Sequence, residues 1–338
     1  MNSLERIMAT ITGEDADYQP FTLLLSLFGA SLIKADTHEY YRNPNLWFEG
    51  QKAAIDIFDP DILITPFSIT LEGEAFGSEL VLLNKYAPNI KKPFITDLTQ
   101  FDQLQAPDFD KSEAIQFLLK ATDLIAEKYK ETKAIAAPIA SPCDTPALLM
   151  GVEMWIDTLL FNPKKVELIL KKTTEHFVRF GNEYLARGAS FLVIPVDITS
   201  AAIISEKIFK QLLPYFENTF NQIKGPIVIH SGGTKILPFL DRFAKLPNVI
   251  GCVLEHTEKF ETARQIVGDK MVLMGNIDGS NFNKFSIEKI KEKTLEILNN
   301  RKNDKHFIFA SSNADIPYDT PFETIQAVVD TIRNFKKY

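Results

Sequence analysis

The chain has 338 residues, of which 45% are hydrophobic and 24% charged, and its formal net charge at pH 7 is -7. This balance is typical of a globular α/β protein, and without basic runs it argues against nucleic acid or an anionic membrane as a partner. No apolar stretch reaches the ~20 residues that span a bilayer. The two distant cysteines, Cys143 and Cys252, form no disulfide framework, and the polar start is unlike a signal peptide, so we expect a cytoplasmic protein.

Eight short, almost continuously apolar runs follow one another along the chain, and each is predicted to be a strand. Continuous apolar runs are typical of strands that are buried on both faces, as in a parallel sheet covered by helices. The runs are residues 21–27, 61–67, 134–139, 191–196, 226–231, 249–254, 271–276 and 306–311.

Amphipathic segments between these runs predict helices. The segment NPKKVELILKKTTEHFVRFGNEYLARGA has Asn162 as its predicted N-cap, Pro163 at the first helical position and Gly188 as its C-terminal stop. Ser205 and Thr257 are the predicted caps of two later helices.

The alternation of strands and helices predicts one domain over residues 1–338, a closed (β/α)8 barrel with an N-terminal helical extension. An open doubly wound sheet is the alternative. No GxGxxG or Walker pattern opens a helix, which argues against a nucleotide site.

Polar residues close or follow most of the predicted strands. In a (β/α)8 barrel the C-terminal ends of the strands meet at one mouth, where the active site lies. We therefore predict a polar pocket there, formed by Glu72, Glu74, Asp197, His230, Glu255, Asn276, Asp278, Ser311, Ser312, Asn313 and Asp315.

His230 is predicted to face this pocket, with Asp197 and Glu255 at the ends of the neighbouring strands. Gly232 and Gly233 would let the backbone approach a ligand closely. A neutral histidine beside carboxylates can bind a metal. A protonated one can act as a general acid, its pKa raised by the carboxylates. The alternative is a histidine with a purely structural role at the barrel rim.

The other histidines and the cysteines have simpler interpretations. His176 lies within a predicted helix, and His256 lies either in the pocket or at a helix start. Cys252 is predicted to be a core residue. Cys143 follows a strand at the same mouth and is a candidate ligand or nucleophile.

Several motifs along almost the full length resemble one known superfamily. They include LERIMATITGEDADYQP, LEGEAFGSEL, NPKKVELILKKTTE, VDITSAAIISEKIFKQLLPYF, the IHSGG turn, DKMVLMGNIDG and DIPYDTPFETIQAVVDTI. The chain resembles the uroporphyrinogen decarboxylase superfamily, and within it the corrinoid-dependent methyltransferase branch. The resemblance implies a (β/α)8 barrel with its site at the C-terminal mouth.

The chain departs from two activities of this superfamily. It lacks the arginine-rich N-terminal segment that grips a polycarboxylate, and Ile69 stands where the decarboxylases have an aspartate. The thiol-methylating branch binds zinc through a His-x-Cys motif and a later cysteine. Here His230 is present, but Gly232 and Ala314 stand at the two cysteine positions. Losing both thiolates removes the soft site that activates a thiol.

The resemblance therefore implies an O-demethylating methyltransferase, which moves a methyl group from a small methoxylated, aromatic substrate to the cob(I)alamin of a separate corrinoid protein. His230, Asp197 and Glu255 are the predicted catalytic residues, and His230 with Glu255 is the candidate zinc set. The predicted substrate- and cofactor-binding residues are Glu72, Glu74, Phe67, Gly232, Gly233, Asn276, Asp278, Asn313 and Asp315, with Phe21 and Phe28 as further candidate walls.

The alternatives are a methylcobalamin-dependent methyltransferase with another acceptor, a decarboxylase of a small acid, and a non-catalytic binding protein. The superfamily also suggests homodimer formation, and no cobalamin-binding DxHxxG stretch occurs in this chain.

Overall fold

A computed structural model describes residues 1–269 and 271–335 of the chain. Within them, eight parallel strands form one sheet, in the order β1-β10-β9-β8-β7-β6-β5-β2. These strands are β1 (Phe21–Thr22), β2 (Ile62–Ile64), β5 (Ala134–Pro138), β6 (Phe191–Pro195), β7 (Ile227–His230), β8 (Val249–Val253), β9 (Val272–Asp278) and β10 (Phe307–Ser312).

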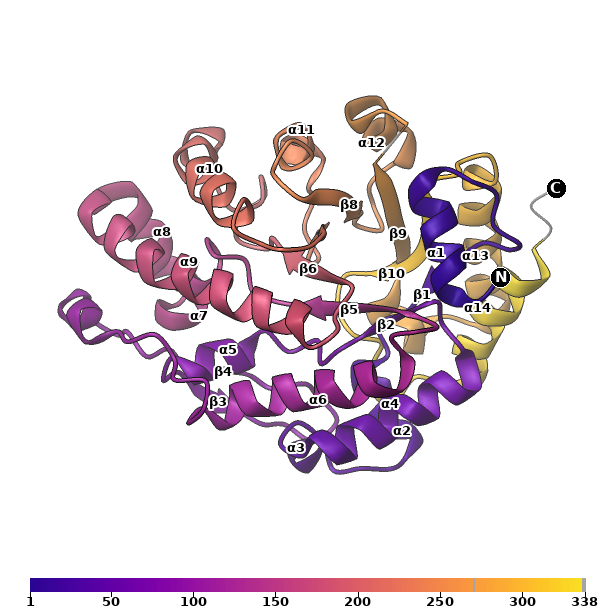
Figure 1. Ribbon diagram of the computed structural model, residues 1–338, viewed down its shortest axis with the longest axis horizontal. Helices are drawn as coiled ribbons and strands as arrows, with labels where there is room; N and C mark the ends of the chain where they lie inside the picture. The colour runs from indigo at the N-terminus through magenta and orange to yellow at the C-terminus, as the bar shows by residue number, and fades with distance from the viewer. Residues whose placement is uncertain (270, 336–338) are drawn as a thin grey trace.

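The two outer strands of this order, β1 and β2, meet and close the sheet. The Asp61 backbone N–H donates to the Phe21 carbonyl at 2.9 Å, and the Phe21 N–H donates to Asp61 Oδ2 at 3.0 Å. Figure 1 shows the strands at the centre with the helices arranged around them. The predicted (β/α)8 barrel is confirmed.

Helices and short 3-10 turns connect the strands. The α-helices are α1 (Ser3–Thr12), α2 (Ser26–Leu32), α3 (Thr37–Tyr40), α4 (Pro44–Phe58), α5 (Thr70–Ala75), α6 (Glu113–Tyr129), α7 (Thr145–Met150), α8 (Val152–Phe161), α9 (Pro163–Ala186), α10 (Glu206–Phe220), α11 (Leu240–Phe243), α12 (Phe260–Val267), α13 (Ile287–Arg301) and α14 (Phe322–Asn334). The 3-10 helices are η1 (Leu98–Gln103), η2 (Leu237–Phe239) and η3 (Gly279–Lys284). No helix in the described ranges is long and apolar enough to cross a membrane.

The structure corrects several local predictions. The run 21–27 is a two-residue strand followed by helix α2, because a short apolar run fits a buried strand and a buried helix equally well. A hairpin of β3 (Glu79–Val81) and β4 (Asn89–Lys92) was not predicted. Ser205 caps α10 as predicted, accepting the Ile208 N–H at 3.4 Å. Thr257 caps nothing, because α12 begins at Phe260, and Asn162 precedes α9 without a side-chain capping bond.

The apolar side chains form two layers. One cluster fills the barrel interior and includes Phe191, Val193, Val228 and Met274. The larger cluster lies between the strands and the surrounding helices, and it holds the predicted wall residue Phe21. Phe28 also belongs to this outer layer, and its ring packs 6.2 Å from that of Phe58. Phe21 and Phe28 therefore pack against helices and do not face the mouth.

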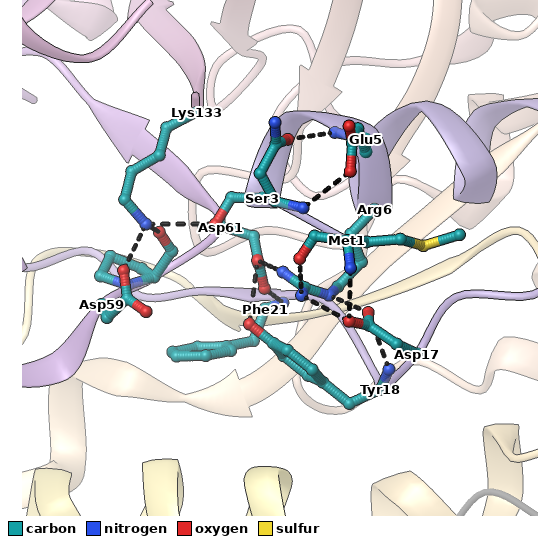
Figure 2. A network of polar contacts seen from close by, with 12 residues as sticks. Met1, Ser3, Glu5, Arg6, Asp17, Tyr18, Phe21, Asp59, Asp61 and Lys133 are labelled. Atoms are coloured by element: carbon teal, nitrogen blue, oxygen red, sulfur yellow. Dashed lines mark hydrogen bonds and ion pairs between the residues drawn. The ribbon is translucent and has the colours of Figure 1, made fainter. Parts of the chain in front are cut away.

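Helix α1 closes the N-terminal end of the barrel. Its Ile7 side chain belongs to the interior cluster. The preceding residue, Arg6, lies in a buried network, where its guanidinium contacts Asp61 at 2.5 Å and Asp17 at 2.6 Å, as Figure 2 shows. Tyr18 stacks on the same guanidinium, 3.7 Å from ring centroid to Cζ, and donates its hydroxyl to Asp61. Charged groups therefore join α1 to the starts of β1 and β2.

Candidate active site

His230 is the last residue of β7 and is buried at the C-terminal mouth. Its Cα pairs with Pro195 on β6 and with Val253 on β8. Val228, two residues earlier, lies in the barrel interior, and side chains alternate along a strand, so the His230 ring also points toward the barrel axis. The Phe67 ring lies 5.5 Å from it, between centroids.

The hydrogen bonds of His230 define which of its nitrogens carries the proton. The Gly232 backbone N–H donates to Nδ1 at 2.9 Å, so the neutral ring carries its proton on Nε2. Nε2 is buried and has no partner in the described chain. Burial lowers the pKa of His230 from 6.5 to about 4. The sequence-based expectation of a pKa raised by carboxylates is wrong, because desolvation dominates and disfavours the imidazolium.

An apolar cavity adjoins the His230 ring, lined by Phe67, Phe191, Val193 and Met274 among others. Its volume is about 20 Å³, which holds about one water molecule. The cavity is therefore too small for anything larger than a water molecule.

A pair of acidic side chains lies on one side of the mouth. Asp197 follows β6, and its Oδ1 occupies the space beside the Cα of Gly232, 1.2 Å from where a Cβ would stand. Asp144, on the loop after β5, accepts a hydrogen bond from the Thr199 hydroxyl. Burial raises the pKa of Asp197 to about 7 and that of Asp144 to about 8, and the charge of Asp197 contributes to the second shift.

A chain of polar contacts lies on the other side of the mouth, across the ends of β8, β9 and β10. Glu255 Oε1 lies 2.5 Å from His256 Nδ1, and His256 Nε2 lies 3.7 Å from Asp278 Oδ2. Asp278 Oδ1 accepts from the Ser280 hydroxyl at 3.0 Å, and Ser280 in turn accepts from Asn313 Nδ2 at 2.8 Å.

These polar contacts decide the surroundings of three predicted site residues. The amide oxygen of Asn313 lies 2.6 Å from the position of a Cβ on Gly233, so this glycine makes room for a side chain of the protein itself. Its predicted close approach to a ligand stays a prediction. Glu255 is paired with His256, and no hydrogen bond joins Glu255 to His230 among the described residues. The predicted trio of His230, Asp197 and Glu255 is therefore not one hydrogen-bonded group. A hollow of about 500 Å³, lined by His256, Asp278 and Lys293 among others, adjoins these polar contacts.

Three other predicted site residues have structural partners. Glu72 is buried against His176, at 3.1 Å from Nε2, and accepts the Ala140 N–H at 2.6 Å. Glu74 forms a two-pronged ion pair with Arg42, at 2.5 and 2.6 Å. Asn276 Nδ2 donates to the carbonyls of residues 255 and 258 at 3.0 and 2.9 Å. These contacts hold the loops around the mouth.

Asp315 and the two serines after β10 also take structural positions. Asp315 accepts the backbone N–H groups of Ser26 and Leu27, and burial raises its pKa to about 8. Ser311 Oγ accepts the Leu24 N–H at 2.8 Å, and Ser312 donates to the Ile277 carbonyl at 3.4 Å. These contacts join β10 to its neighbours.

The residues considered for zinc do not converge. His230 Nδ1 accepts from the backbone, and Glu255 is bound to His256, so neither is oriented toward the other. Across residues 1–269 and 271–335, no group of three or more His, Cys, Asp or Glu has the arrangement of a metal site. Cys143 is fully buried in the core, which raises the pKa of its thiol well above the usual value. The side chains present do not fit the metal, and we derive no step through it.

Two residues of the mouth were missed from the sequence. Asp144 and Thr199 both lie a few residues beyond predicted strands, but Ser141 and Asp197 are the first polar residues there. A rule that takes the first polar residue after a strand therefore misses both. In the segment SPCDTP, Cys143 was the predicted candidate, and the next residue, Asp144, was not selected.

The largest of these hollows lies at the opposite end of the barrel and is not the site. It has a volume of about 840 Å³ and is lined by residues of the Arg6 network and by Lys133. The Lys133 ammonium already contacts Ser3, Asp59 and the Pro60 carbonyl, at 2.5 to 3.2 Å. The charged side chains around this hollow stabilise the closure of the barrel by helix α1.

A (β/α)8 barrel with buried polar atoms gathered at its C-terminal mouth is the arrangement of an enzyme of the barrel class. The profile of the uroporphyrinogen decarboxylase (URO-D) family matches residues 2–335. The chain therefore belongs to the URO-D family, and the superfamily resemblance seen in the sequence is confirmed.

Relatives of two activities are similar to the chain. The uroporphyrinogen decarboxylase of Helicobacter acinonychis is 23% identical over 327 residues, covering 93% of this chain and 92% of the relative. The methylcobamide:CoM methyltransferase MtaA of Methanosarcina barkeri is also 23% identical, over 333 residues, covering 96% and 95%. A solved methyltransferase from Methanosarcina mazei superposes with a TM-score of 0.85 over 99% of both chains, at 21% identity.

Proposed function

We propose that the chain is a methyltransferase that moves a methyl group from a small methoxylated aromatic compound to the reduced corrinoid of a separate protein. The observation that carries the proposal is the buried, unpartnered Nε2–H of His230, beside the Phe67 ring and above an apolar cavity. A fixed donor of this kind stabilises negative charge that develops on an oxygen. The similarity to methyltransferases of the same family supports the class of reaction.

The neighbourhood of Gly232 argues for an oxygen leaving group and against a thiol acceptor. A cysteine at position 232 would place its Cβ 1.2 Å from Asp197 Oδ1, so the carboxyl occupies the space that a thiolate ligand would need. The described residues at the mouth include no cluster of side chains that could hold a metal ion. The polar groups available to a substrate there are hydrogen-bond donors and carboxyls.

The roles of the chain's own residues follow from their positions. When bound, a reduced corrinoid supplies the nucleophile that takes the methyl group. His230 donates Nε2–H to the ether oxygen, and Phe67 packs against the aromatic ring. The cavity of about 20 Å³ is far too small for a corrin ring, so the partner protein has to present its cofactor over the mouth.

The direct test mixes the purified chain, a methoxylated arene and reduced cobalamin under anaerobic conditions, with and without a corrinoid protein. We expect loss of the cob(I)alamin absorbance, growth of the methylcobalamin absorbance and release of the corresponding phenol. Carbon dioxide release from a small carboxylic acid without corrinoid, and no methylcobalamin from any arene tested, would replace the proposal with a decarboxylase. The decarboxylases among the relatives make this the second candidate.

Replacing His230 tests its role as a donor. We expect His230→Leu to lower kcat by ~10²–10³-fold, the usual effect of removing one donor to a developing oxyanion. His230→Gln keeps a side-chain N–H and should retain more activity than the leucine variant. Methyl transfer followed by absorbance, with KM determined separately, checks this. A leucine variant that is folded and fully active would remove His230 from the mechanism.

A further inference from the structure

The carboxyl of Asp197 has no partner at the mouth of the barrel. Asp197 is half-buried, two residues after the end of β6, and its Oδ1 is buried without a hydrogen bond. It forms no ion pair within the part of the chain that the structure describes. Charges that leave water are normally paired, because removing a carboxylate from water is costly. A cation supplied from outside the chain would therefore be stabilised at this carboxyl.

Asp197 lies against the loop that holds His230. Its Oδ1 occupies the space beside the Cα of Gly232, and the Gly232 N–H donates to His230 Nδ1 at 2.9 Å. The strands β6 and β7 are paired neighbours, with Pro195 opposite His230. His230 is 2% exposed, and its Nε2 also lacks a partner. An unused acceptor and an unused donor at adjacent strand ends are therefore available to one molecule bound at the mouth.

The other charged groups around Asp197 do not neutralise it. Asp144 is a second acid, 6% exposed, and the charge of Asp197 contributes to its raised pKa. The first cations that follow Asp197 and His230 in the sequence, Lys207 and Lys235, are exposed, and neither forms an ion pair with Asp197 in the described ranges. This side of the mouth therefore attracts a cationic group and repels an anionic one.

We propose that the methyl donor carries an alkylammonium group on its methoxylated ring, which Asp197 binds while His230 donates Nε2–H to the ether oxygen. The inference rests on the proposed methyl transfer and names the class of its substrate. A hydrogen bond between an ammonium and a carboxylate is charge-assisted and stronger than a neutral one. A ring with a carboxylate in the same place is repelled, so the charge of the side group selects the substrate. Phe67 packs against any of these rings and does not distinguish them.

Calorimetric binding of methoxybenzylamine, methoxybenzyl alcohol and methoxybenzoate tests the cation site without any activity. The titrations are made at pH 8, above the pKa of about 7 that burial gives Asp197, where the amine is protonated. We expect the amine to bind ~10-fold or more tightly than the alcohol, and the benzoate most weakly. Asp197→Asn should remove the preference for the amine, whereas Asp157→Asn, at an exposed position of α8, should keep it.

Three results overturn the proposal. One is wild-type protein that binds the amine no more tightly than the alcohol, or not at all. Another is a preference for the amine that persists in a folded Asp197→Asn variant. The third is a preference that Asp144→Asn removes and Asp197→Asn does not, which would assign the cation to the other acid.

Methyl transfer separates the failure of this inference from the failure of the proposed function. We expect Asp197→Asn to raise KM for methoxybenzylamine ~10-fold, with little change in kcat and none in KM for the alcohol, because uniform binding is lost. Methyl transfer from both compounds with equal KM in wild type would overturn the cation site and leave the methyltransferase function standing. Preferred binding of the amine, with methyl transfer from no arene, would leave the cation site and reject the methyltransferase function.

Discussion

Replacing Arg6 with alanine is expected to lower the free energy of unfolding by about 3–5 kcal/mol, the usual cost of leaving a buried charge without its partner. Asp61 is fully buried, and the Arg6 guanidinium at 2.5 Å is its cationic partner (Figure 2). Asp17 is about 42% exposed and can be solvated when Arg6 is lost, so Asp61 accounts for most of the effect. Urea denaturation followed by circular dichroism gives the measurement.

The matched controls separate the charge from the packing. Lys52→Ala removes an exposed ion pair with Asp56 and should leave the urea midpoint of unfolding nearly unchanged. Adding Asp61→Asn to the Arg6 variant should recover part of the loss, because the orphaned charge is then gone. If Arg6→Ala unfolds at the same urea concentration as wild type, the network does not stabilise the closure of the barrel by α1.

Gly232→Ala is expected to reduce methyl transfer by ~10²–10³-fold, the usual effect of losing one donor to a developing oxyanion. The new Cβ would lie 1.2 Å from Asp197 Oδ1 and 2.4 Å from its Cγ, so the carboxyl and the loop have to move apart. The same residue donates its backbone N–H to His230 Nδ1, and a shifted loop would loosen that bond. One methyl group therefore disturbs both the Asp197 carboxyl and the orientation of His230.

Gly268 provides the control for this variant. Its φ of +70° is close to the +61° of Gly232, but a Cβ there meets no atom within 4 Å. Gly268→Ala therefore meets no neighbouring atom and carries only the strain of its positive-φ, extended backbone, about 1–3 kcal/mol, and should keep full activity. Methyl-transfer kinetics of both variants make the comparison. Equal activity of the two would mean that the position of Asp197 is unimportant for the reaction.

The sequence predicted the barrel and much of the mouth for a simple physical reason. Buried parallel strands leave continuous apolar runs, and the first polar residue after each run marks the C-terminal edge. Polar residues selected in this way include His230, Asp197, Asp278 and Asn313, which the structure places at or just beyond the C-terminal ends of β7, β6, β9 and β10.

What the sequence could not predict depends on contacts between distant segments. Glu72 follows a strand like the others, but it pairs with His176, 104 residues away, and so belongs to the core. The pKa of His230 was predicted in the wrong direction because neighbouring strand ends suggested carboxylates, whereas the amount of burial depends on the packed barrel. Glu255 pairs with the adjacent His256 because of the rotamers that the two side chains adopt, and the sequence does not determine these rotamers.

The two ends of the barrel differ in how well their buried polar atoms are hydrogen-bonded. At the α1 end, Arg6, Asp61 and Tyr18 satisfy one another, while at the mouth His230, Asp144 and Asp197 retain buried atoms without partners. Buried polar atoms without partners lower the free energy of unfolding. The hydrogen-bonded network at the α1 end offsets this loss of stability. Directed evolution can therefore remodel substrate scope at one end and raise heat tolerance at the other, with little interference between the two campaigns.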